Sequence, residues 1–343
     1  MRSEVFFRIM ATFYLLMVHS NSLTEAKVIG VNYGLLGDNL PPPIHTISLL
    51  KSKNITRVRL FNPTEDVLQA LHNTRIELVL GTLNQDLQPL ATDISFAFRW
   101  VQSNVVPHAS AVRFRYITAG NEVIPSAMQN YVLPAMQNLK SALQVSLLPY
   151  PIPVTTVVAT SVLGTSFPPS SGEFSTEASH IMTPIAAFLL QNRTPLLVNV
   201  YPYFAYINDR KDISLAYALF NTNEVVVRDG ELEYRNLFDA MADAVYAALE
   251  KVGCGSVEVV VAESGWPSKG NDVANVGNAE TYNNKFIRHV LGGYGTPRRP
   301  GKSIEAYVFA LFNEDLKPAG TEQNFGLFYP DMSDVYPVNF NAI

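Results

Sequence analysis

The sequence predicts an α/β protein of the TIM (β/α)8-barrel class, and three observations lead to that prediction. Eight short apolar runs with strand-like composition recur along the chain, and segments with helical periodicity lie between them. Strict alternation of strands and helices is typical of a parallel sheet, and eight repeats are what a closed barrel needs. The 343 residues are many for one hydrophobic core, but barrels of this class reach such lengths as a single domain.

Each predicted strand is a short run rich in β-branched and aromatic residues. The eight runs are Val28–Tyr33, Arg57–Phe61, Ile76–Gly81, Arg115–Val123, Val154–Ser161, Leu196–Phe204, Val257–Trp266 and Ile304–Asn313. Three consecutive valines, Val259 to Val261, mark the seventh run as a strand buried on both faces. The carboxyl ends of parallel barrel strands meet at one rim, where this fold class places its chemistry.

Amphipathic stretches between these runs predict the helices that surround the barrel. They include Asp93–Val106, Tyr131–Leu147, Asn236–Val252 and Asn278–Leu291. Asn236 is a suitable N-cap for the third of these helices, and Gly253 lies just past its end. Asn278 and Gly292 are expected to bracket the fourth helix in the same way.

One connection, the sixth strand-to-helix loop, is longer than the rest. About 31 residues separate Phe204 from Asn236, and they contain Asp229-Gly230 between two strand-like runs. An Asp-Gly pair in that setting is a strong hairpin signal. We therefore expect a small hairpin-containing subdomain at the rim, and no second domain.

Composition excludes several classes of function. Lysine and arginine number 25 against 30 aspartates and glutamates, so no basic footprint indicates nucleic acid or an anionic membrane surface. The six histidines show no ligand spacing, which predicts no metal. No glycine-rich phosphate loop follows a strand, and we expect no cofactor. There is also no Gly-x-Ser-x-Gly elbow that would make Ser264 a nucleophile.

The beginning of the chain resembles a secretory signal. Two arginines precede an apolar core from Ile9 to Val18, which is too short to span a bilayer. We expect a signal peptide over residues 1–26 and a single barrel domain over residues 27–343. The alternative for this segment is a buried N-terminal helix. No other segment reaches membrane-spanning length, which predicts a secreted, extracellular protein without a membrane anchor.

Two sequons and one cysteine bear on that prediction. Asn54-Ile55-Thr56 and Asn192-Arg193-Thr194 make Asn54 and Asn192 candidate glycosylation sites in a secreted chain. Cys254 is the only cysteine, so an intramolecular disulfide is impossible and the core must be stable without one.

Two glutamates end predicted strands that face each other across a barrel. Glu263 ends the valine-rich seventh strand, and Glu122 follows Asn121 at the end of the fourth. Hydrolysis of a glycosidic bond needs one carboxylic acid to protonate the leaving oxygen and one carboxylate to attack or to activate water. An amide beside the acid, such as Asn121, can bind a sugar hydroxyl. Capping of a helix or pairing with an arginine is the alternative for either glutamate alone.

Several longer motifs carry a resemblance to a known family. They are Ile29-Gly30-Val31-Asn32-Tyr33-Gly34, Gly120-Asn121-Glu122-Val123, Leu197-Val198-Asn199-Val200-Tyr201-Pro202-Tyr203-Phe204, Glu263-Ser264-Gly265-Trp266-Pro267-Ser268 and Phe325-Gly326-Leu327-Phe328. In these motifs the chain resembles the plant β-1,3-glucanases of glycoside hydrolase family 17, which are TIM barrels with a retaining mechanism. The resemblance implies that Glu263 is the nucleophile and Glu122 the general acid/base. Asn32 departs from the family, where many relatives carry cysteine.

Further residues are candidates for binding the substrate. Aromatic faces pack against the apolar face of a glucose ring, and Tyr33, Tyr201, Phe204 and Trp266 end predicted strands at the rim. Core packing is the alternative for each of these rings. The resemblance also points to Glu314, Lys317 and Glu322 beyond the eighth strand. Glu314 and Lys317 are expected to pair and to orient substrate or nucleophile, with a solvated surface pair as the alternative.

The sequence therefore predicts a secreted, monomeric endo-hydrolase of 1,3-β-D-glucosidic linkages in callose, laminarin or fungal wall glucan, with a polysaccharide as its only partner. The resemblance implies one of two biological roles, defence against fungi or remodelling of the plant's own wall. Two alternatives stay open. One is a mixed-linkage 1,3-1,4-β-glucanase, and the other is a glucan-binding protein on the same barrel without turnover.

Overall fold

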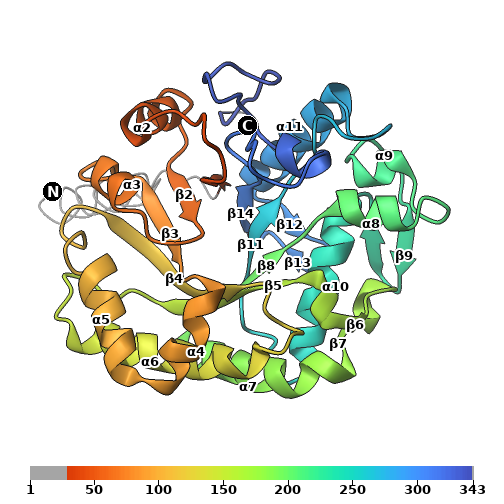
Figure 1. Cartoon of the computed structure of the whole chain (residues 1–343). Helices are drawn as coiled ribbons and strands as arrows, with labels where there is room; N and C mark the ends of the chain where they lie inside the picture. Colours follow the sequence, from red (N-terminus) through yellow and green to blue (C-terminus); the bar gives the residue numbers. More distant parts are fainter. Residues whose placement is uncertain (1–28, 342–343) are drawn as a thin grey trace, which may run out of the picture.

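The computed structural model describes residues 29–341 and shows a closed barrel of eight parallel strands ringed by helices (Figure 1). The barrel strands are β1 (Ile29–Asn32), β2 (Arg57–Leu60), β3 (Glu77–Gly81), β4 (Arg113–Asn121), β5 (Val154–Ala159), β8 (Leu196–Asn199), β11 (Val259–Ser264) and β14 (Glu305–Val308). Because β14 pairs with β1, the sheet closes without an open edge. The predicted fold class is confirmed. The signal peptide predicted over residues 1–26 lies outside the described residues.

The outer layer is helical and covers the barrel on all sides in Figure 1. Its helices are α2 (Pro43–Ser52), α3 (Glu65–Ala70), α4 (Leu87–Thr92), α5 (Ile94–Asn104), α6 (Val132–Val145), α7 (Thr176–Asn192), α8 (Pro202–Asn208), α9 (Leu215–Ala218), α10 (Leu237–Lys251) and α11 (Val276–Gly292). Short 3-10 turns lie at Asn84–Asp86, Gln129–Tyr131, Thr160–Val162, Pro169–Ser171 and Thr321–Asn324.

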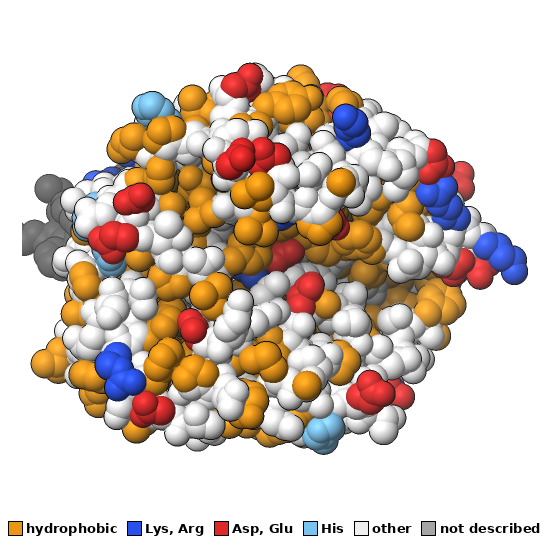
Figure 2. All heavy atoms as spheres, in the orientation of Figure 1, with side chains coloured by type: hydrophobic (Ala, Val, Ile, Leu, Met, Phe, Trp, Pro, Cys, Tyr) orange, Lys and Arg blue, Asp and Glu red, His pale blue; other side chains and the backbone are white. Residues whose placement is uncertain are grey.

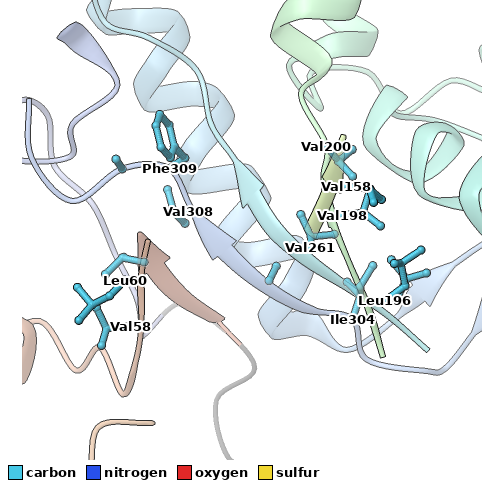
Figure 3. Close-up of a cluster of buried hydrophobic side chains, with 14 of the residues drawn as sticks. Val58, Leu60, Val158, Leu196, Val198, Val200, Val261, Ile304, Val308 and Phe309 are labelled. Carbon is cyan, nitrogen blue, oxygen red and sulfur yellow. The ribbon is translucent and has the colours of Figure 1, made fainter. Parts of the chain in front are cut away.

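Alternating side chains on each strand serve two separate cores. Val58, Val198 and Val261 point outward into the layer between sheet and helices, where they join the cluster drawn in Figure 3. Their strand neighbours Leu197 and Val260 point inward and pack inside the barrel. This explains the continuous apolar runs of the sequence, because a strand covered on both faces has no polar side.

The predicted subdomain is present on the sixth connection. Helices α8 and α9 precede a hairpin of β9 (Val227–Asp229) and β10 (Leu232–Tyr234), which turns at Gly230 with a positive φ of 60°. A second hairpin that the sequence did not predict, β6 (Leu163–Thr165) with β7 (Glu173–Phe174), lies on the fifth connection. Asp229 ties the two loops together by accepting hydrogen bonds from the backbone N–H and hydroxyl of Ser170 at 2.6 and 2.7 Å.

Most helix boundaries follow the sequence signals, but two elements differ. Asn236 caps α10 as predicted, accepting from the N–H of Asp239 at 2.8 Å, and Gly253 follows with φ 76°. The N-cap of α11 is Asn275 rather than Asn278, whose own N–H donates to the Asn275 side chain at 3.0 Å. The helix runs through Gly292 and ends at Gly293.

The sixth predicted strand is also too long at its carboxyl end. It stops at Asn199, because Pro202 starts helix α8 three residues later. Proline suits the first turn of a helix, where its missing N–H has no helical partner. Phe204 therefore lies on a helix that leans over the rim instead of on a strand.

A short hairpin precedes β14 and is formed by β12 (Gly295–Thr296) and β13 (Arg299–Pro300).

Among the described residues, no helix combines the length and apolar character that crossing a membrane requires.

Candidate active site

Glu122 and Glu263 lie in one cleft at the carboxyl ends of the barrel strands. The cleft has a volume of about 550 Å³. Its walls are formed by Glu122, Ala159, Thr160, Ser161, Asn199, Tyr201, Phe204, Ala205, Asn208, Met241, Glu263, Phe309, Glu322 and Phe325. The face seen in Figure 2 is hollowed across its middle, with acidic side chains inside the depression.

Irregular strand pairing aims both glutamates at the cleft. The β4–β5 register shifts between Thr118 and Asn121, and the β11–β8 register shifts between Val261 and Glu263. Such irregularities bend a strand and redirect the side chains that follow. Glu122 itself has a positive φ of 54°. A non-glycine residue in this left-handed region is strained by roughly 1–3 kcal/mol, and such residues cluster at functional sites.

The Glu263 carboxylate is buried against a cation and a phenol. The Nη1 atom of Arg59 donates to Oε1 at 2.6 Å, and the hydroxyl of Tyr201 donates to Oε2 at 2.8 Å. Arg59 is 1% exposed, and its Nη1 also donates to the side-chain oxygen of Asn32 at 3.0 Å. These partners leave Glu263 with both carboxylate oxygens hydrogen-bonded.

The cation beside Glu263 is Arg59, which lies on β2 and is 204 residues away in the sequence. Lys317, which the sequence predicted to pair with Glu314 and to orient the substrate or the nucleophile, forms that pair at 2.8 Å, and within the described residues the structure gives it no ion pair with Glu263. Asn32, at the end of β1, accepts a hydrogen bond from Arg59 and so takes part in the site.

Glu122 has a different environment. The Nδ2 atom of Asn199 donates to its Oε1 at 2.8 Å, and no cation pairs with it among the described residues. Burial raises the pKa of Glu122, and the negative charge of Glu263 across the cleft raises it further. Hydrogen bonding by Asn199 and the charge of Arg59 act in the opposite direction. The net shift is upward, so Glu122 is the carboxyl that holds a proton more readily.

The predicted sugar-binding residues fall into two groups, and one group borders the cleft. Tyr201, Phe204 and Glu322 line it, and the ring of Phe204 is 38% exposed. Asn121 lies beside it, with its side-chain oxygen accepting from Arg59 Nη2 at 2.8 Å. Because that oxygen is already hydrogen-bonded, the amide nitrogen of Asn121 is the side-chain group that can donate to a ligand.

The second group is buried. Trp266 is 0% exposed, donates to the carbonyl of Val273 at 2.9 Å and packs against Tyr203 and Tyr282. Tyr33 is 1% exposed and hydrogen-bonds Thr46 at 3.2 Å. Neither ring has surface available to a sugar, so core packing, the alternative for both, is what the structure shows. The strand ends at Ser264, and the indole two residues later packs into the core.

The predicted pair of Glu314 and Lys317 is formed, but it is not solvated. Glu314 is 2% exposed and also accepts from the N–H of Leu36 at 2.8 Å. The ammonium of Lys317 lies 4.2 Å from the ring centroid of Phe309, which is part of the cleft wall. The pair thus supports the wall from behind.

Sequence reasoning missed Arg59, Asn199, Phe309 and Phe325. A signal for Arg59 was present, because a charged residue at the carboxyl end of a buried strand needs an internal partner. Phe309 lies in the run Ile304–Asn313 predicted as the eighth strand, but the strand ends at Val308, and Phe325 follows the Thr321–Asn324 turn beyond it. No metal-binding cluster of three or more ligands occurs within residues 29–341. Of the two sequon asparagines, Asn54 is exposed and Asn192 is half-buried.

Comparison with known proteins gives a consistent result. The sequence profile described as "Glycosyl hydrolases family 17" matches residues 29–340. The chain is 56% identical over 323 residues to "Putative glucan endo-1,3-beta-glucosidase GVI" of Hordeum vulgare, covering 93% of this chain and 99% of that protein. It is 48% identical to a "Glucan endo-1,3-beta-glucosidase" of Vitis vinifera, with 95% of both chains covered.

A solved structure is similar over the same region. "CJP38, a beta-1,3-glucanase and allergen of Cryptomeria japonica pollen" superimposes with a TM-score of 0.89 at 47% identity, covering 91% of this chain and 98% of that one. A structure from a study of "two plant beta-glucan endohydrolases with distinct substrate specificities" gives 0.87 at 45% identity, covering 91% and 100%.

Proposed function

This chain belongs to glycosyl hydrolases family 17, and from that premise we propose that it is a glucan endo-1,3-β-glucosidase. One observation carries the assignment of roles. Two carboxyl groups line the same cleft in different environments: Glu263 is paired with Arg59, whereas desolvation and the charge of Glu263 raise the pKa of Glu122. That difference is what acid-assisted cleavage of a glycosidic bond requires.

In the first half of the reaction, Glu263 attacks the anomeric carbon while Glu122 protonates the departing glycosidic oxygen. Arg59 and Tyr201 hold the attacking carboxylate in one orientation through its two oxygens. The bond from carbon to the leaving oxygen breaks, and a covalent ester of Glu263 forms.

In the second half, Glu122 acts as a base. Ester formation removes the negative charge of Glu263, which is one of the causes that raise the pKa of Glu122. Glu122 can then take a proton from water, which attacks the same carbon from the opposite face and releases Glu263. Two inversions give net retention, a geometry that calls for carboxyl groups roughly 5–5.5 Å apart.

The rest of the cleft supplies groups that suit a glucan. Phe204 presents an exposed ring for the apolar face of a glucose unit, and the amide nitrogen of Asn121 can donate to a hydroxyl near the reacting carbon. Glu322 adds an acceptor to the lining of the cleft. Because an endo-acting enzyme binds the middle of a chain, the cleft should be open at both ends.

The test is to compare purified protein on laminarin and on barley mixed-linkage β-glucan. We expect release of reducing ends from laminarin as mixed oligosaccharides, with far slower attack on the mixed-linkage glucan. Equal or faster attack on the mixed-linkage glucan would favour the second candidate, a 1,3-1,4-β-glucanase, which the distinct specificities named for one similar structure keep relevant. Binding of laminarin without any turnover would identify a glucan-binding protein instead.

We further propose that the protein is secreted and acts as a monomer on cell-wall glucan such as callose. The signal-like residues 1–26 and the exposure of sequon Asn54 support this location. Release of the mature chain into the medium of expressing cells, with a mass shift on deglycosylation, is the corresponding measurement.

A further inference from the structure

Asn199 is a buried amide on β8, which is paired with β11, the strand that carries Glu263, and is separated by β5 from β4, which Glu122 follows. It is the last residue of β8, and its backbone lies opposite Ala159 of β5 in one ladder and opposite Glu263 of β11 in the other. The residue is 2% exposed. Strand pairing on both sides therefore fixes its backbone, and its side chain reaches the cleft from a rigid base.

Its hydrogen bonds allow one orientation of the amide. The Nδ2 atom donates to Oε1 of Glu122 at 2.8 Å and to Oδ1 of Asn121 at 3.3 Å. Turning the amide over would place its oxygen against two other oxygens. The observed orientation is kept although it leaves the buried Oδ1 of Asn199 without a hydrogen-bond partner in the described part of the chain.

Asn199 also completes a chain of contacts between the two glutamates. Arg59 donates to Glu263 through Nη1 and to Asn121 through Nη2, and Asn121 in turn accepts from Asn199. Asn199 then donates to Glu122. The position of the acid is thereby linked to the position of the nucleophile through side chains that are themselves held in place.

We propose that Asn199 is a positioning residue that holds the Glu122 carboxyl in its working orientation and sets the pH at which Glu122 releases its proton. The proposal rests on the proposed function, because it assigns Glu122 the role of acid and base. It adds a residue that acts through Glu122 instead of touching the reacting atoms.

The charges around Glu122 show why such a donor is needed. Glu263 on β11 and Glu322 on the Thr321–Asn324 turn face it with negative charge, and the Tyr201 phenol faces the same site. The charge of Arg59 lowers the pKa of Glu122, but that guanidinium is already paired with Glu263. Burial and the two carboxylates raise the pKa of Glu122, and the hydrogen bond from Asn199 lowers it. Without that bond, Glu122 would hold its proton too tightly to give it up in the first half of the reaction.

The experiment compares Asn199→Ala, Asn199→Asp and the wild-type enzyme by the pH dependence of kcat/KM on laminarin. The high-pH limb reports loss of the proton of the acid, in a pair whose two ionisations are coupled. Removing a donor to the ionised form should move that limb upward by about one pH unit in Asn199→Ala. It should move further in Asn199→Asp, which has nearly the same shape and adds a negative charge. The matched control is Asn208→Ala, which removes another amide of the cleft for which the structure gives no hydrogen bond to either glutamate. The high-pH limb of kcat/KM in this variant should stay where it is in the wild type.

A second measurement does not need turnover. In protein labelled with carboxyl-¹³C glutamate, the resonance assigned by Glu122→Gln should titrate at higher pH in both Asn199 variants than in the wild type. An unmoved limb and an unmoved titration in folded Asn199→Ala protein would overturn the proposal even if kcat falls. If wild-type protein proves inactive on glucan, the proposed function fails, whereas the titration still decides whether Asn199 controls Glu122.

Discussion

Each end of the barrel interior contains carboxylates in contact with an arginine, but the two ends differ in charge balance. At the amino ends of the strands, Arg57 and Arg115 face Glu77 and Glu305, with contacts of 2.9 Å from Arg57 to Glu77 and 2.6 Å from Arg115 to Glu305. The phenol of Tyr307 donates a further hydrogen bond to Glu305 at 2.8 Å. Two cations and two anions form a closed network at that end.

At the carboxyl ends, two glutamates line the cleft, and one arginine contacts one of them. Arg59 pairs with Glu263, and Glu122 receives a neutral amide in place of a cation. Desolvation in the cleft and the charge of Glu263 raise the pKa of Glu122, which has no cation of its own among the described residues. The same residue types thus form a balanced ion-pair network at one end and, at the other, the carboxyl pair for which we propose the catalytic roles, with one arginine beside it.

The largest effect should come from removing the paired carboxylate at the active end. Glu263→Gln keeps the shape and can still contact Tyr201, but it cannot form the ester. We expect a loss of kcat on the order of 10⁴-fold or more on laminarin, with the protein still folded. Steady-state assays with circular dichroism as a folding check measure this, and substantial residual turnover would contradict the nucleophile assignment.

The unpaired carboxylate should behave differently when it is removed. Glu122→Ala should lose about 10²–10⁴-fold on laminarin but less on an aryl glycoside with a good leaving group, which needs little protonation. Azide added to this variant should yield a β-glycosyl azide, identified by NMR. An α-configured product would mean that the reaction inverts and that the roles must be reassigned.

Changing the shared cation tests whether the active end depends on its geometry. In Arg59→Lys, one ammonium replaces a planar group that contacts both Glu263 and Asn121. We expect kcat to fall by roughly 10²-fold, the size found when one preorganised donor is lost. Activity close to that of the wild type would show that positive charge alone is sufficient.

The balanced end should respond through stability instead. Glu305→Gln leaves Arg57 and Arg115 short of one buried anion, which should lower the free energy of unfolding by about 3 kcal/mol. At temperatures well below melting, kcat on laminarin should be unchanged. Chemical denaturation and laminarin assays on the same preparation separate the two effects, and a loss of kcat would show that the two ends are coupled.

A smaller effect is expected from an ion pair outside both ends, that of His289 on α11 with Asp239 on α10 at 2.9 Å. Burial alone would lower the pKa of His289, but the hydrogen bond and charge of Asp239 give a net rise. A raised pKa in the folded state adds stability that is full below the unfolded value of about 6.5 and disappears as pH rises through the folded value.

His289→Gln should therefore lower the melting temperature by a few degrees at about pH 5 and by less at about pH 9. The matched control is His180→Gln, which changes an exposed histidine on α7 and should shift the melting temperature little at either pH. A pH-independent difference for His289→Gln would indicate lost packing against its neighbours Phe220 and Phe238 rather than lost charge.

The order of elements and the two glutamates could be predicted from the sequence because both depend on local pattern. Buried parallel strands need continuous apolar runs such as Val259 to Val261, and caps such as Asn236 act on N–H groups a few residues away. A carboxylate that directly follows such a strand must lie at the barrel mouth, whatever the rest of the chain does.

The tertiary structure decided what those glutamates contact and which aromatic rings face the cleft. Arg59, Asn199 and Glu122 are brought together from β2, β8 and the end of β4, and no local pattern records that they meet. Trp266 and Phe204 both follow strands, yet one is fully buried and the other borders the cleft. The reason is physical: past the last paired residue a side chain is aimed by bulges, a proline-started helix and neighbouring loops, not by the two-residue period of the strand.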